Sequence, residues 1–213
     1  VDSVVGGVKI GVAKCDAAAI AANNFGIITG GTVGSCDITF AGESIGAVTA
    51  INNAGATISG VTLSENAAIV YRGPATNVGG IAGKTISRQL VPGETSNYRL
   101  IVEECSSTGT ISIAGPSKVR ASGTVAQTQG AYRISGCTFS GAIESTDATK
   151  RDVVIGGIMA MADKECVGLV EGCTFSGRIS AAQAGANNFF GGIYGNNGGA
   201  ASVVNDCRTT ASA

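Results

Sequence analysis

The chain has 213 residues, of which 33 are glycine, 44% are hydrophobic, 14% are charged and 5% are aromatic. This composition fits neither a disordered segment nor an ordinary globular domain. The 14 basic residues nearly balance the 15 acidic ones and are scattered, so no nucleic-acid partner is expected. No apolar run approaches the roughly 20 residues needed to cross a bilayer, so no membrane insertion is expected.

Residues 1–35 are predicted to form an irregular first coil. The chain begins at Val1 rather than Met, which we interpret as a mature secreted protein or a domain cut from a longer chain. The alanine-rich run from Cys15 to Ala22 predicts a short helix or an insertion. Either would cap the end of the domain, because an open terminal coil leaves unpaired strand edges.

Residues 36–207 contain two recurring motifs. The first is a strand that ends in cysteine, and its equivalents lie 25, 44, 32, 36 and 34 residues apart, at Cys36, Val61, Cys105, Cys137, Cys173 and Cys207. The second places glycine before an aliphatic residue, with spacings of 40, 33, 44, 33 and 35, at Val8, Val48, Ile81, Val125, Ile158 and Ile193. Two independent markers therefore indicate six units of similar size.

Each unit contains three short apolar or alternating pieces, such as residues 153–161, 167–173 and 177–181, separated by Gly, Asn, Asp and Ser. Three strands of about five residues with three corners use roughly 30 residues, which matches one coil of a parallel β-helix. The predicted fold is therefore an all-β, right-handed parallel β-helix of about six coils. It forms a single domain over residues 1–213, with residues 208–213 as a tail, and is expected to be part of a longer chain.

Two insertions interrupt the units, one over residues 87–97 and one over residues 144–152. Insertions in a solenoid form loops, frequently on one face. These loops are where we expect ligand contacts. The candidate contact residues are Glu94, Asn97, Tyr98, Asp147, Lys150 and Arg151.

The cysteine and glycine positions are interpreted as packing positions. In a β-helix, equivalent residues of successive coils stack about 4.8 Å apart, and a thiol packs there as a small hydrophobe. The paired glycines before Ile81, Ile158 and Ile193 either adopt a positive φ or pack close to the next coil. Cys15 and Cys166 lie about four coils apart, roughly 19 Å, which is too far for a disulfide.

The chain has no histidine, which excludes imidazole bases, the usual nucleophile pairs and the usual zinc ligands. The cysteines are too far apart for a four-cysteine zinc site. No catalytic residue, metal ligand or cofactor is therefore predicted.

Acidic residues keep one enzymatic alternative open, because parallel β-helices also host polysaccharide lyases and hydrolases that use clustered carboxylates or bound calcium. Glu104, Glu171 and Asp206 fall one or two residues before the cysteine position and would line one outer face. The corresponding residues Ser35 and Gly136 leave that column incomplete, which favours solvated charges. Further acidic or basic candidates are Glu103, Asp163, Lys164 and Glu165.

A rank of exposed threonines would favour ice binding. Thr62, Thr138 and Thr174 share one position after the cysteine marker. At the equivalent positions of other units the rank is interrupted, which argues against this function; the interrupting residues are Asp37, Ser106 and Arg208. Phe139 and Phe175 also share one position and are predicted to stack on each other rather than bind a ligand.

The closest repeat matches are residues 191–199, with the sequence Gly-Gly-Ile-Tyr-Gly-Asn-Asn-Gly-Gly, and residues 174–179, with the sequence Thr-Phe-Ser-Gly-Arg-Ile. The order of these motifs over residues 30–207 resembles the GLUG-type repeats of bacterial surface proteins, including adhesins and the non-catalytic regions of immunoglobulin-cleaving peptidases. The resemblance implies a secreted or cell-surface β-helical module. It implies no catalytic residue.

The expected function is thus that of a non-enzymatic, extracellular bacterial module acting in adhesion, in ligand presentation or as a rigid spacer. Expected partners are a host or bacterial surface glycan or protein, and an open end would favour end-to-end self-association. A glycan-active β-helix enzyme is the alternative.

Overall fold

The computed structural model shows a chain built from short strands. The described residues contain 30 strands and no helix. Their ranges are 4–5, 8–13, 16–34, 36–72, 76–87, 100–114, 118–146, 152–182, 188–199 and 201–210.

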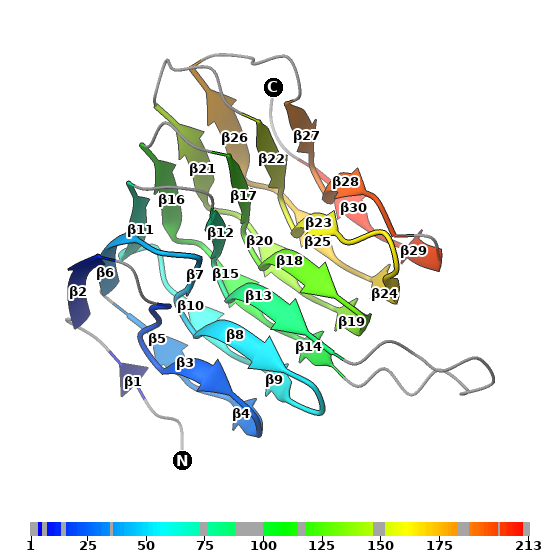
Figure 1. The fold of residues 1–213 in the computed structure, drawn as a ribbon, viewed down its shortest axis with the longest axis horizontal. Coiled ribbons are helices and arrows are strands. Elements are labelled where there is room, and N and C mark those ends of the chain that lie inside the picture. Colours follow the sequence, from blue (N-terminus) through cyan, green and yellow to red (C-terminus); the bar gives the residue numbers. More distant parts are fainter. Residues whose placement is uncertain are drawn as a thin grey trace.

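The strands form five sheets, and consecutive strands along the chain belong to consecutive sheets, except that β3 (Ala21–Asn24) of sheet 4 follows β2 (Val8–Ala13) of sheet 2 (Figure 1). Sheet 1 contains β1 (Val4–Val5), β5 (Thr32–Val33), β10 (Thr62–Leu63), β15 (Ser106–Ser107), β20 (Thr138–Phe139), β25 (Thr174–Phe175) and β30 (Arg208–Thr209). Sheet 2 contains β2 (Val8–Ala13), β6 (Cys36–Ala41), β11 (Ala67–Tyr71), β16 (Thr110–Ile113), β21 (Ala142–Ser145) and β26 (Arg178–Ala181). Sheet 3 contains β7 (Ser44–Gly46), β12 (Thr76–Gly79), β17 (Val119–Ser122), β22 (Val153–Gly156) and β27 (Phe189–Gly191).

Sheet 4 contains β3 (Ala21–Asn24), β8 (Thr49–Asn53), β13 (Ala82–Ile86), β18 (Val125–Gln129), β23 (Met159–Ala162) and β28 (Tyr194–Asn197). Sheet 5 contains β4 (Ile27–Thr29), β9 (Thr57–Ser59), β14 (Ile101–Glu103), β19 (Ala131–Ser135), β24 (Val167–Glu171) and β29 (Ala201–Asn205). One passage of the chain through all five sheets is called a coil below.

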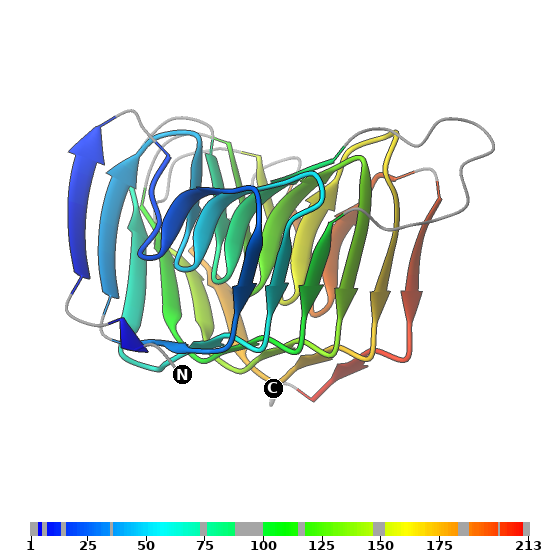
Figure 2. The same ribbon diagram turned by 90° about the horizontal axis from the view of Figure 1, so that it is seen from below.

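The described strands pair in parallel throughout, and successive coils lie side by side along one axis (Figure 2). The predicted class, a parallel β-solenoid, is confirmed. The predicted three strands per coil are wrong, because there are five. Residues 153–161, read as one piece, are β22 and β23 separated by a bend at Gly157 and Ile158. Ile158 is fully buried at this bend, so the apolar pattern continues across a corner that periodicity does not reveal.

The first coil is more regular than predicted. Residues 16–22 contain no helix, and Ala17 bridges to Ile45 at the position where sheet 3 begins. The described parts of residues 1–35 supply β1 to β5, each within one of the sheets. They do not cover the end of the stack, because Ile27 of β4 is 75% exposed.

The register corrects three of the predicted equivalences. Thr32 pairs with Thr62, so Gly31 and not Cys36 occupies the position of the cysteine column in the coil before Val61. Cys36 instead belongs to sheet 2, opposite Val8 and Ala67. Two positions of the second motif also change. The residues that align with Ile81 and Ile158 are Ile20, not Val8, and Thr124, not Val125. The residues that follow them pair in sheet 4, as Ala21–Thr49, Ala82–Thr49, Ala82–Val125 and Val125–Met159.

The core forms because side chains alternate inward and outward along each strand. In β11, for example, Ala67, Ile69 and Tyr71 are buried while Ala68 and Val70 are not. In-register pairing then stacks the inward residues of successive coils, as in the column of Ile58, Val102, Ile134 and Val170, all fully buried. Removing such side chains from water is the main stabilising contribution, about 1.5–3 kcal/mol for each large aliphatic residue.

The two sequence motifs meet inside the core. The rings of Phe139 and Phe175 stack with centroids 6.0 Å apart and planes 15° from parallel. Each ring lies on a glycine of the paired-glycine motif: a Cβ on Gly123 would lie 2.0 Å from Cγ of Phe139, and one on Gly157 would lie 2.3 Å from Cδ2 of Phe175. The paired-glycine positions have no positive φ. Of the two predicted reasons for these glycines, a positive φ or close packing against the next coil, close packing is therefore the correct one.

We therefore expect Gly123→Ala to destabilise the protein by about 1–3 kcal/mol, since the added methyl group has to displace the buried Phe139 ring. Chemical unfolding measures this difference. Gly26→Ala is the matched control, because a Cβ there meets nothing within 4 Å and the residue has no positive φ. Equal stability of the two variants would contradict the packing described.

Candidate functional site

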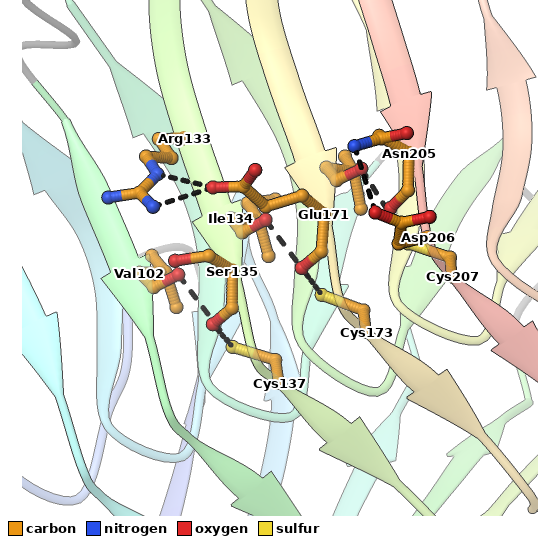
Figure 3. A network of polar contacts seen from close by, with 11 residues as sticks. Val102, Arg133, Ile134, Ser135, Cys137, Glu171, Cys173, Asn205, Asp206 and Cys207 are labelled. Atoms are coloured by element: carbon orange, nitrogen blue, oxygen red, sulfur yellow. Dashed lines mark hydrogen bonds and ion pairs between the residues drawn. The ribbon is translucent and has the colours of Figure 1, made fainter.

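The cysteine column is the most regular feature of the interior (Figure 3). Cys105, Cys137 and Cys173 are buried, Cys207 is half-buried in the last coil, and Val61 occupies the same position two coils from the start. Each of the four thiols donates a hydrogen bond to the carbonyl two residues earlier, at 3.2 to 3.4 Å. All four are free thiols. The structure confirms the prediction of a packing column.

The electrostatics of this column favour a neutral thiol at its centre, Cys137, whereas hydrogen bonding with Cys137 lowers the pKa of Cys105 and of Cys173. Hydrogen bonding with the sulfurs of Cys105 and Cys173, together with burial, raises the pKa of Cys137 well above its usual value. Burial also raises the pKa of Cys166, a further free thiol, which donates a hydrogen bond to the Thr128 carbonyl at 3.2 Å. Because the thiolate is the nucleophile, Cys137 and Cys166 are unsuited to nucleophilic chemistry.

The residues directly before the column share a left-handed backbone conformation. Glycine occupies most of these positions, including Gly60, Gly136 and Gly172, with φ between 59° and 64°. Glu104 and Asp206 adopt φ of 52° and 49° at the same place, which is costly for residues with a Cβ. The turn geometry is thus set by the fold and imposed on these two acids.

This geometry separates the acidic residues that the sequence placed on one face. Glu104 and Asp206 do share a column, but Gly136 and Gly172 lie between them, so they are three coils or roughly 14 Å apart. Glu171 lies in the neighbouring column, where its Oε1 accepts hydrogen bonds from Nε and Nη2 of Arg133 at 2.8 and 2.6 Å (Figure 3). These three acids therefore do not converge on one point. Glu103 shares the column of Glu171, two coils away.

The described ion pairs connect different coils. Besides Arg133 with Glu171, they join Arg178 to Glu144, Lys84 to Glu43 and Lys118 to Asp152. Pairs with this much solvent exposure contribute little stability, at most about 1 kcal/mol each. Their arrangement is that of charges spread over the solenoid surface.

Sheet 1 carries two ranks of hydroxyl side chains, of which all members except Ser64, whose hydroxyl is buried, are exposed or half-buried. The corrected register replaces Asp37 by Thr32 in the first rank, so the rank lacks a hydroxyl only at its two ends, at Val4 in the first coil and at Arg208 in the last. Its hydroxyl members are Thr32, Thr62, Ser106, Thr138 and Thr174. Two residues further along each strand, a second rank contains Ser64, Thr108, Ser140, Ser176 and Thr210. The prediction that Asp37 interrupts the rank is wrong, because Asp37 lies in sheet 2.

A hollow of about 550 Å³ lies where sheet 4 turns into sheet 5. It spans three coils and is lined by Ile86, Ser87, Gln129, Gly130, Met161, Asp163, Lys164, Glu165 and Cys166. Oδ1 of Asp163 accepts a hydrogen bond from Gln127 Nε2, and Oδ2 accepts one from Gln129 Nε2, both at 2.7 Å. The carboxylate is therefore held in one orientation by the neighbouring coil. Apolar walls with a few fixed polar groups are typical of small-molecule sites.

Three of the sequence candidates, Asp163, Lys164 and Glu165, thus line one hollow. The two hydrogen-bond partners of Asp163, Gln127 and Gln129, were not among the predicted residues. The sequence did contain an indication of these partners, because β18 has two glutamines at alternate positions and no charged residue. Alternation places both glutamines on the same side of the strand.

The predicted contact residues of the two insertions lie outside the described residues. These are Glu94, Asn97, Tyr98, Asp147, Lys150 and Arg151. Ser87, at the rim of the hollow, directly precedes the segment 88–99 in the chain, so the first insertion begins at this site.

Comparison with known proteins identifies no relative. No family model, no curated protein and no solved structure matches the chain. In the part of the chain that the structure describes, no three His, Cys, Asp or Glu residues are grouped to hold a metal, and no helix is long and apolar enough to cross a membrane. Arguments about function therefore depend on geometry alone.

The neutral thiol of Cys137 predicts a pH dependence of stability. An unfolded thiol titrates near pH 8.5, whereas folded Cys137 keeps its proton to higher pH. The contribution of this thiol to the unfolding free energy should therefore fall as the pH rises above about 8.5, by up to about 1.4 kcal/mol per pH unit, while the lowered pKa values of Cys105 and Cys173 act in the opposite direction. The variant Cys137→Val carries the residue that stands in the same column at position 61. It should reduce this decrease of the unfolding free energy with pH.

Urea unfolding at a series of pH values measures this effect. Cys207→Val, at the half-buried end of the column, should change the slope less. A slope that stays the same in Cys137→Val would show that this thiol is not held neutral by its surroundings.

Proposed function

We propose that the chain is a non-enzymatic β-helical module of a secreted or cell-surface protein, which acts in adhesion or ligand presentation. The observation that supports this proposal is the hollow beside Asp163, a concave site formed where three successive coils turn from sheet 4 into sheet 5. A carboxylate already oriented by two amides binds with little loss of freedom.

The chemistry of the hollow fits a hydroxyl-rich ligand such as a sugar. The Asp163 oxygens retain further acceptor capacity for ligand hydroxyls, beyond the bonds from Gln127 and Gln129. Met161 and Ile86 provide apolar surface for a ring face, and exposed Lys164 and Glu165 stand at the rim. A surface glycan is therefore the proposed ligand class.

Binding to an array of neutral and acidic oligosaccharides tests this function. We expect wild type to bind, and Asp163→Asn or Lys164→Ala to weaken binding at least tenfold, because each removes a charge from the hollow. Asp37→Ala, a change of an exposed aspartate on sheet 2, should leave binding intact. Absence of binding, or equal binding by all variants, would contradict the proposal. Cleavage of a bound polysaccharide would instead favour the glycan-active enzyme.

The hydroxyl ranks of sheet 1 support ice binding as a second candidate function. Along the stack the hydroxyls repeat about every 4.8 Å, and the two ranks lie about 6.6 Å apart along the strands. Glycines border the ranks on both sides in several coils, for example Gly136 before Thr138 and Gly141 after Ser140, so few side chains project beyond the hydroxyls. A rigid, regular array of hydroxyl groups can order water in the same periodic way.

Freezing-point hysteresis of the purified protein tests this second function. We expect wild type to depress ice growth and Thr138→Lys, in the middle of the first rank, to abolish the effect. Thr110→Lys is the matched control on sheet 2, in a column that already carries Lys9 and Arg178. Ice growth that wild type does not change would rule this function out.

A further inference from the structure

Large exposed apolar side chains of the described residues occur only at the two ends of the stack. At the N-terminal end, Phe25 is 74% and Ile27 is 75% exposed. At the C-terminal end, Val203 is 55% exposed. The other members are Ile20 in the first coil and Phe189, Phe190 and Val204 in the last. Both ends also carry edge strands whose outer backbone groups have no neighbouring coil, which is a template for pairing with another chain.

We propose that the C-terminal end of one copy docks on the N-terminal end of a second copy, with β28 against β3 and β29 against β4. The contact would continue the in-register parallel pairing that already joins each coil to the next in sheets 4 and 5. Every internal coil-to-coil contact of this chain therefore serves as the template for the contact between copies.

The columns of sheet 5 continue across this contact. The inward column runs from Ile28 in the first coil to Val204 in the last, and its four middle members are fully buried aliphatic residues. The outward column runs from Ile27 to Val203. Docking places Val204 beside Ile28 and Val203 beside Ile27, so the most exposed aliphatic residues at the two ends cover each other.

A polar column of sheet 4 also matches. Asn24 Nδ2 donates to Asn52 Oδ1 of the next coil at 2.7 Å, in a column whose last member is exposed Asn197. Docking places Asn197 one coil before Asn24 of the second copy. The Asn197 amide can then donate to Asn24 Oδ1, as Asn24 Nδ2 donates to Asn52 Oδ1. Asn197 Nδ2 already donates to the Ser202 carbonyl at 3.2 Å, and an apolar partner would leave its second N–H without an acceptor, which favours a second copy as the occupant.

The contact joins two different surfaces of the chain. Such a head-to-tail interface leaves one free end of each kind at every stage and produces an open series of oligomers rather than a closed dimer. In sheet 1, β30 of the first copy and β1 of the second copy would occupy the same place in the joined stack. One of these two-residue strands is therefore displaced when copies join.

Blocking each end separately tests the proposal. Ile27→Lys blocks the N-terminal end and Val203→Lys blocks the C-terminal end. Leu169→Lys is the control, because Leu169 lies in the same outward column inside the stack, next to Arg133, which shows that a long cation fits there. Sedimentation velocity over a range of concentrations should show a series of oligomers for wild type and Leu169→Lys, and monomers for each end variant alone.

An equimolar mixture of Ile27→Lys and Val203→Lys should form heterodimers and nothing larger, since only one compatible pair of ends remains. Asn197→Ala should weaken association about fivefold, the change expected for one net hydrogen bond of about 1 kcal/mol. Wild type that stays monomeric, a mixture that stays monomeric, or equal loss of association in Leu169→Lys would each overturn the proposal.

Discussion

Backbone pairing between successive coils is the constraint on which the rest of this structure depends. Each strand lies parallel to and in register with its equivalent one coil away, about 4.8 Å distant, so every position of the coil is repeated along the stack. The same ladder aligns the buried thiols, the rings of Phe139 and Phe175, the outward hydroxyls and the left-handed turn before each cysteine. A side chain in this fold is therefore best described by its column rather than by its neighbours in the chain.

Much of this could be predicted from the sequence, and the failures have identifiable causes. The recurrence of Cys137-Thr138-Phe139 and Cys173-Thr174-Phe175 was sufficient to establish the solenoid and the thiol column. The number of strands per coil was not predictable from apolar pattern, because Ile158 and Cys173 are buried at corners and conceal the bends. Cys36 was misplaced because a cysteine five residues beyond Gly31 happened to resemble the marker, and only the register with Ala67 corrects it.

The candidate site was harder to predict, since it is formed by residues of three coils. Asp163 stood out as a charged residue, but its orientation depends on Gln127 and Gln129, one coil earlier. Without alignment of the coils these residues are more than 30 positions away and no local pattern connects them. Conversely, Glu104 and Asp206 looked like partners by spacing, and the stack separates them by two glycine coils. Function in such a fold is therefore decided by which columns lie beside each other.

The contact between the paired glycines and the phenylalanines has a consequence for how such a chain grows. Gly123 receives the Phe139 ring and Gly157 receives the Phe175 ring, and each pair belongs to a single coil. A gene duplication that copies one whole unit would carry both complementary pieces with it. The stack can thus lengthen by insertion of an entire unit without waiting for compensating mutations.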